Sequence, residues 1–125
     1  MKPHEKERLQ KIADEIVQTI IKKDEAYGSS WKSHGGYSAF FNLDRKYSRV
    51  EAGASQFQYD LFKATIELEE GRDSLEDLIA YALLTLMETY TEMSPESLPD
   101  RLHAILELDQ SGEPGPDYVD QDKED

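Results

Sequence analysis

The sequence contains no cysteine, no long apolar run and few basic residues. Without cysteine, the chain cannot form disulfide bonds, a thiolate zinc site or a cysteine nucleophile, and this usage is typical of a reducing compartment. No apolar stretch approaches the roughly 20 residues that a membrane-spanning helix needs. The N-terminal segment alternates charged and apolar side chains and lacks the apolar centre of a secretory signal. The sequence therefore predicts a cytoplasmic protein without a membrane partner.

The excess of acidic residues argues against binding to duplex nucleic acid. The formal net charge is −13, and six acids against one base lie between residues 111 and 125, which leaves −8 for residues 1–110. A protein that binds duplex DNA usually presents a basic stripe. The composition therefore speaks against long polyanions as partners, but it permits a small phosphate ligand accompanied by a divalent cation.

Apolar periodicity predicts an all-α fold, a small bundle of four to five helices. Apolar side chains recur at steps of three and four, as on one face of a helix. The third helix is predicted to start at a Ser55 cap and to end at Gly71, although the alternation from Phe57 to Leu61 also permits a short strand. The fourth has the widest apolar surface and is predicted to be the most central. The predicted helices span residues 4–27, 37–54, 55–71, 74–92 and 97–108.

The length and the C-terminal composition predict one folded domain with a tail. A chain of 125 residues has the size of a single domain. Residues 1–94 are predicted to form the helical domain, and residues 95–110 a short C-terminal helix. Residues 111–125 are predicted to be a disordered acidic tail, because they have too little apolar surface to offset the entropy of ordering.

The chemistry available to the chain is restricted to oxygen ligands and cationic side chains. The sequence has no Walker loop, no dinucleotide-binding glycine pattern and no nucleophile elbow, and its three histidines lack metal-ligand spacing. Carboxylates suit Mg²⁺, which proteins usually hold through one or two of them together with waters and phosphates. The carboxylate candidates are Asp24, Glu25, Asp73, Glu76 and Asp77, and the cationic candidates on the second helix are Arg45, Lys46 and Arg49.

Each of these candidates also has an ordinary structural interpretation. Ser74 and Asp77 have the spacing of a capping box, so Asp77 could serve only the start of its helix. Trp31, between two glycine-containing breaks, could plug the end of the core or form a stacking wall for a base. The bases of the second helix could be a solvated face. Residue patterns alone leave both interpretations open.

Three blocks of sequence resemble the nucleotide modification associated domain 1 family. They run from Lys23 to Trp31 (KDEAYGSSW), from Asp44 to Arg49 (DRKYSR) and from Asp73 to Leu84 (DSLEDLIAYALL). The family is similar to the MazG-like all-α nucleoside triphosphate pyrophosphohydrolases of phages and bacteria. The resemblance implies a MazG-like helical fold, a nucleotide or nucleotide-derived ligand, and assembly into a homo-oligomer.

Carried to this sequence, the resemblance singles out Asp24, Tyr27, Trp31, Lys46, Arg49, Asp77 and Tyr81, and Lys22, Arg45 and Asp73 are added to the predicted site from the residue pattern. Asp24 and Asp77 are predicted to be catalytic, and Asp24, Asp73 and Asp77 to bind Mg²⁺. The predicted ligand-binding residues are Lys22, Tyr27, Trp31, Arg45, Lys46, Arg49 and Tyr81.

One departure from the MazG pattern bears on catalysis. MazG-type enzymes hold Mg²⁺ with a glutamate motif on one helix and an E-x-x-D motif on the next, whereas the second helix here carries bases. Three hypotheses follow. The first is a phage-type nucleotide-binding protein of nucleotide metabolism that acts as a Mg²⁺-dependent pyrophosphohydrolase. The second is a binder that sequesters a host nucleotide signal without turnover, and the third is a protein-interaction module that uses its acidic tail.

Overall fold

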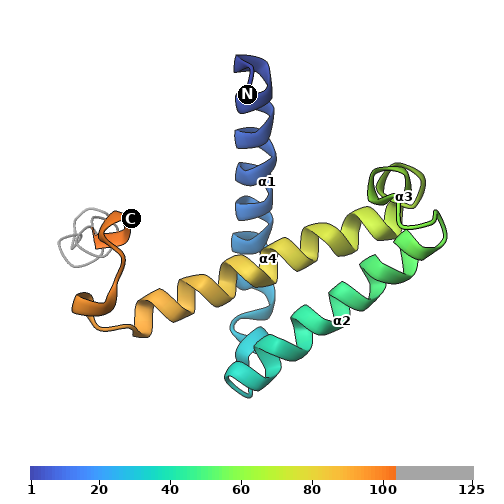
Figure 1. The fold of residues 1–125 in the computed structure, drawn as a ribbon. Helices are drawn as coiled ribbons and strands as arrows, with labels where there is room; N and C mark the ends of the chain where they lie inside the picture. The colour runs from blue at the N-terminus through green and yellow to red at the C-terminus, as the bar shows by residue number, and fades with distance from the viewer. Residues whose placement is uncertain (104–125) are drawn as a thin grey trace. The chain divides into compact units, whose positions relative to one another are not determined.

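The computed structural model describes residues 1–103, which form helices joined by short turns (Figure 1). The prediction of an all-α small bundle is confirmed. The elements, in order, are α1 (Pro3–Tyr27), η1 (Ser30–Lys32), α2 (Gly36–Ser55), α3 (Leu61–Glu67), α4 (Glu69–Glu92) and η2 (Pro95–Ser97). Residues Met1–Thr85 form one compact unit and a second begins at Leu86, so the boundary between these two units lies within α4.

Local signals at both ends of α1 explain its bounds. Pro3 occupies the first turn, where its missing N–H is not needed, and the Glu5 carboxylate accepts a hydrogen bond of 2.8 Å from the Lys2 backbone N–H. At the other end, Gly28 adopts φ +63° and its N–H donates to the Asp24 carbonyl at 2.8 Å. This positive φ suits glycine, and the chain turns there into η1.

The second glycine break precedes α2. Gly35 also has φ +63°, and the Ser38 hydroxyl accepts a hydrogen bond from the His34 N–H and donates one to the Gly35 carbonyl, both at 3.0 Å. The predicted helix over 37–54 is therefore confirmed to within one residue at each end. From this position α2 contacts η1 at one end and α3 at the other.

The bounds predicted for the third helix and the start predicted for the fourth are wrong, whereas the predicted end of the fourth helix at residue 92 is confirmed. Ser55 ends α2 and does not cap α3; the cap is Asp60, whose carboxylate accepts a hydrogen bond from the Lys63 N–H at 3.1 Å. Residues 56–60 form a turn and not a strand. Only Leu68 separates α3 from α4, and Gly71 lies inside α4.

The early start of α4 overturns the capping interpretation of Ser74 and Asp77. Because α4 begins at Glu69, Ser74 lies in its second turn and Asp77 follows a turn later. Arg72 donates hydrogen bonds to the carbonyls of Thr65 and Ile66 at 2.9 and 3.1 Å, which satisfies the open C-terminal end of α3. Asp73 and Asp77 are therefore both helical and, at a spacing of four residues, lie on one side of α4.

The second unit is described up to residue 103. In η2 the hydroxyls of Ser94 and Ser97 lie 3.1 Å apart, and the Leu98 carbonyl lies 3.0 Å from Nε2 of His103. Residues 100–103 are helical, so the helix begins three residues after the start that was predicted for the segment 97–108. The rest of that segment and the predicted tail over 111–125 lie outside the described residues.

Large apolar side chains are poorly buried in the first unit. In the described part of the chain no large side chain is less than 2% exposed, and the buried apolar residues of this unit are Ile16, Ala39, Val50, Ala54 and Ala64. In α4 the buried residue is Ser74, whereas Ile79 and Leu83 are each 40% exposed, so α4 is not the central helix of the single chain. Across residues 1–103 no helix is long and apolar enough to cross a membrane.

Candidate functional site

Asp77 of α4 joins two cations that come from different helices. Its Oδ2 lies 2.8 Å from the Lys46 ammonium of α2, and its Oδ1 lies 3.5 Å from the Lys23 ammonium of α1. The Lys46 side chain is 11% exposed, the Asp77 side chain 28% and the Lys23 side chain 58%. A buried ammonium needs a carboxylate partner because its desolvation is otherwise costly, so the three helices are tied together at this point.

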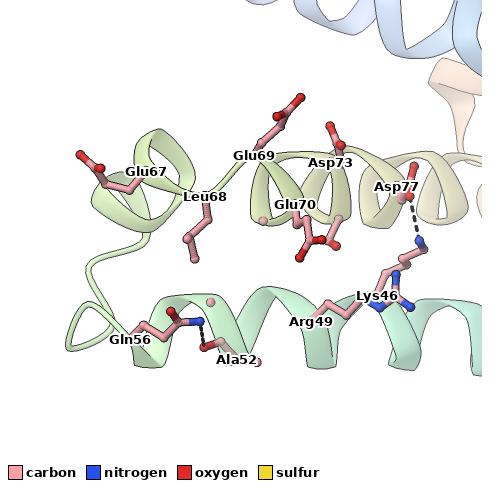
Figure 2. A pocket seen from close by; sticks show the side chains of 13 residues that line it. Lys46, Arg49, Ala52, Gln56, Glu67, Leu68, Glu69, Glu70, Asp73 and Asp77 are labelled. Carbon is pink, nitrogen blue, oxygen red and sulfur yellow. Dashed lines mark hydrogen bonds and ion pairs between the residues drawn. The ribbon is translucent and has the colours of Figure 1, made fainter.

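On one side of Asp77 lies a cavity of about 890 Å³ between α2 and the start of α4. Lys46 and Arg49 reach into it from α2 (Figure 2). Arg49 is exposed and makes no ion pair with any residue in the range 1–103. This cavity, the cationic pocket, therefore contains a guanidinium that is ready to bind an anion.

Acidic residues line the opposite wall of the cationic pocket. The Glu70 side chain is directed toward α2, whereas those of Glu69 and Asp73 are directed away from it (Figure 2). The wall also includes Glu67 and Asp77, so that five acids face two bases. Because Asp77 is neutralised by two ammoniums, the positive charge is concentrated at the Asp77 end of the pocket.

On the other side of Asp77, a cavity of about 250 Å³ is lined by aromatic side chains. Tyr27, Trp31 and Tyr81 come from α1, η1 and α4, and Asp24 lies at the same cavity. Aromatic faces of this kind bind planar rings by stacking. This cavity, the aromatic pocket, brings together five of the predicted site residues, Asp77 included, from two separate sequence blocks.

Arg45 has a supporting position instead of a place in either pocket. Its Nη2 donates to the Asn42 side-chain oxygen at 3.1 Å, and the Asn42 side-chain nitrogen donates to the Trp31 carbonyl at 3.2 Å. The segment that carries Trp31 is thereby fixed to α2. Of the three bases predicted on the second helix, Lys46 and Arg49 line the cationic pocket. Arg45 instead holds Asn42, which supports the wall of the aromatic pocket at Trp31.

The three predicted Mg²⁺ ligands are distributed over the two pockets. Asp73 lines the cationic pocket and Asp24 the aromatic pocket, and within residues 1–103 no three acidic or histidine side chains are grouped as metal ligands. Asp77 lines both pockets, but each of its oxygens already faces an ammonium. The residues present therefore do not fit the three-carboxylate centre that the sequence suggested.

Sequence reasoning missed two residues and misplaced one. Lys23 was not among the predicted site residues, but it follows Ile16 and Ile20 at helical spacing and faces Asp77. Ser74 is 5% exposed and lines the cationic pocket, and its hydroxyl has no hydrogen-bond partner in the described part of the chain. Lys22 lies apart from both pockets, beside Gln18 and Thr19.

The comparisons with known proteins identify no relative: no family model matches the chain, and neither a curated protein nor a solved structure matches it significantly.

Proposed function

We propose that the chain binds a small ligand of the nucleotide class, with its phosphates at Lys46 and Arg49 and its base or sugar in the aromatic pocket. The observation that carries this proposal is that Asp77 lines both pockets. A cation site for phosphate and a stacking site for a ring thus share a wall, which is the arrangement that a nucleotide requires. The residues come from all three sequence blocks on which the resemblance to nucleotide modification associated domain 1 proteins rests.

The local charge supports phosphate as the group bound beside Asp77. At the Asp77 end of the cationic pocket, Asp77 is paired with Lys23 and Lys46, and Arg49 beside them has no carboxylate partner within residues 1–103, while Glu67, Glu69, Glu70 and Asp73 line the rest of the wall. Guanidinium groups bind phosphate through paired, charge-assisted hydrogen bonds. The Ser74 hydroxyl, buried at the same wall without a described partner, is available to donate a further hydrogen bond.

The geometry favours binding without turnover over hydrolysis. Asp77, a predicted catalytic residue, is paired with two lysines, and Asp24 lies in the aromatic pocket and not beside Arg49. Hydrolysis is the second candidate because the Glu70 side chain is directed toward α2 in the pocket that Lys46 lines, and carboxylates beside bound phosphate are where Mg²⁺ is commonly held. A binder that sequesters a nucleotide signal needs no such metal.

Trp31 provides a direct test, because it is the only tryptophan of the chain. We would follow its fluorescence while titrating nucleoside mono-, di- and triphosphates and cyclic dinucleotides, each with and without Mg²⁺. A nucleotide that stacks in the aromatic pocket should quench it. Chromatographic analysis of the incubated nucleotide separates the two candidates, since products formed with Mg²⁺ indicate hydrolysis and unchanged nucleotide indicates binding alone.

One arginine variant and one lysine control locate the site of the ligand's phosphate. Arg49→Ala should weaken the binding of the phosphorylated ligand by about 10- to 100-fold, because a hydrogen bond to a charged group contributes roughly 1.5–3 kcal/mol. Lys22→Ala removes a cation that lies apart from both pockets and should leave affinity unchanged. Equal affinity of Arg49→Ala and the wild type would rule out the assignment.

A further inference from the structure

The outer face of α2 carries four exposed aromatic side chains. Tyr37 is 89% exposed, Phe40 69%, Phe41 62% and Tyr47 54%. Their spacing of three, one and six residues places them along one side of the helix, away from the buried Ala39, Lys46 and Val50. We call this surface the aromatic face.

Such a face is unusual on a surface that remains in contact with water. Single exposed apolar residues are common, but a contiguous patch of large apolar side chains marks an interaction site. With about 200 Å² per aromatic side chain, the four exposed fractions correspond to roughly 550 Å² on one copy. Two such faces would bury roughly 1,100 Å², which reaches the threshold of about 1,000 Å² expected of a specific interface.

We propose that the aromatic face is covered by the same face of a second copy of this chain, with the two α2 helices antiparallel. A two-fold interface of this kind uses one patch twice. If the axis passes near residue 42, midway along the patch, Tyr37 of one copy lies opposite Tyr47 of the other. Asp44, the acid between the aromatics, then lies opposite Phe40 and not opposite a second Asp44, so like charges are kept apart.

The charge of the rest of the chain favours a second copy over the C-terminal segment as the occupant. The aromatic face includes Asp44 and Glu51 and no base. Residues 104–125 contain eight acids and one base. Laying this segment along the face would bring like charges together, whereas the antiparallel arrangement of two α2 helices separates them. This proposal does not depend on the proposed ligand.

The oligomeric state and one charge substitution test the proposal. Sedimentation equilibrium of the full chain should give twice the 14.3 kDa mass of one copy. Phe40→Glu should weaken the dimer by about 30-fold or more, the effect of losing a central aromatic contact. Phe62→Glu replaces an aromatic residue of α3 that is 84% exposed and should leave the dimer intact. A wild type that is monomeric at all concentrations, or a Phe40→Glu dimer as tight as the wild type, would overturn the proposal.

Cross-linking provides a second measurement that does not disturb the aromatic side chains. Because the chain has no cysteine, Asp44→Cys introduces a unique thiol into the aromatic face. A short bis-maleimide should join two copies of this variant, and it should fail to join copies of Lys22→Cys, whose residue is exposed on α1. Equal cross-linking of the two variants, or none with Asp44→Cys, contradicts the antiparallel pairing.

Discussion

Replacing Asp77 should destabilise the fold more than replacing either of its lysine partners. Asp77→Asn keeps the shape of the side chain but leaves the Lys46 ammonium, 11% exposed, without a carboxylate. Removing one partner of a buried ion pair costs about 3–5 kcal/mol when the remaining charge has no compensation. The asparagine oxygen can still accept a hydrogen bond from Lys46, so we expect a loss of about 2 kcal/mol in the free energy of unfolding.

The reciprocal substitutions should cost less for reasons visible in the geometry. In Lys46→Met the apolar stem remains packed, and the Asp77 carboxylate is 28% exposed and keeps Lys23 at 3.5 Å. We expect a loss of about 1 kcal/mol. In Lys23→Met the lost pair is a longer one to a side chain that is 58% exposed, so the loss should be below about 0.5 kcal/mol.

Urea denaturation followed by circular dichroism measures this ranking. The chain concentration must be the same for all variants, because any self-association makes the apparent stability depend on it. Lys22→Met provides the baseline for removing an exposed α1 lysine. Equal destabilisation by Lys46→Met and Asp77→Asn would refute the reasoning. It would show that an unpaired Asp77 carboxylate costs the fold as much as an unpaired Lys46 ammonium.

Two backbone substitutions give further predictions. Gly28→Ala should lower the free energy of unfolding by about 1–3 kcal/mol, because Gly28 has φ +63° and ψ −145°. Gly36→Ala is the control and should cost much less, because Gly36 has no positive φ and open space around its Cα. Thermal unfolding of the two variants compares these losses. Tyr59→Gly should raise the free energy of unfolding by about 0.5 kcal/mol, because glycine adopts the φ of +65° at this position without strain. The gain is small because glycine also increases the entropy of the unfolded chain. Unchanged or lower stability of this variant in urea would show that the turn is not strained.

Strong local signals made α1 and α2 predictable, and their absence explains the errors in α3 and α4. Paired glycines mark the start of α2, whereas only Leu68 separates α3 from α4. Gly71 was interpreted as a helix stop. A Cβ there would lie 3.5 Å from Leu68 and 3.9 Å from the Ala64 carbonyl, which are ordinary contacts, so the position accepts a side chain like any other in the first turn of α4. The glycine was misleading because glycine commonly follows a helix end, although a single glycine can also lie inside a helix.

The candidate site was predictable in its residue types but not in its pairing. The sequence blocks identified Asp77, Lys46 and Trp31, yet which lysine meets Asp77 depends on how three helices pack. Lys22 and Lys23 are adjacent, and about 100° of helical rotation separates them, so an error of one position exchanges a site residue for a solvent residue. The broad apolar stripe of α4 likewise indicated a surface that must be covered, but not whether the cover belongs to the same chain.

The two proposals concern opposite sides of α2 and can therefore be separated experimentally. Phe40 and Arg49 are nine residues apart, and at about 100° per residue their side chains leave the helix in opposite directions. Arg49 lines the cationic pocket, and Phe40 belongs to the aromatic face. Pairing through the aromatic face consequently leaves the pocket accessible to ligand from the other side. Phe40→Glu should change assembly without changing affinity, whereas Arg49→Ala should change affinity without changing assembly. If Phe40→Glu abolished both, the pocket would have to be completed by the second copy.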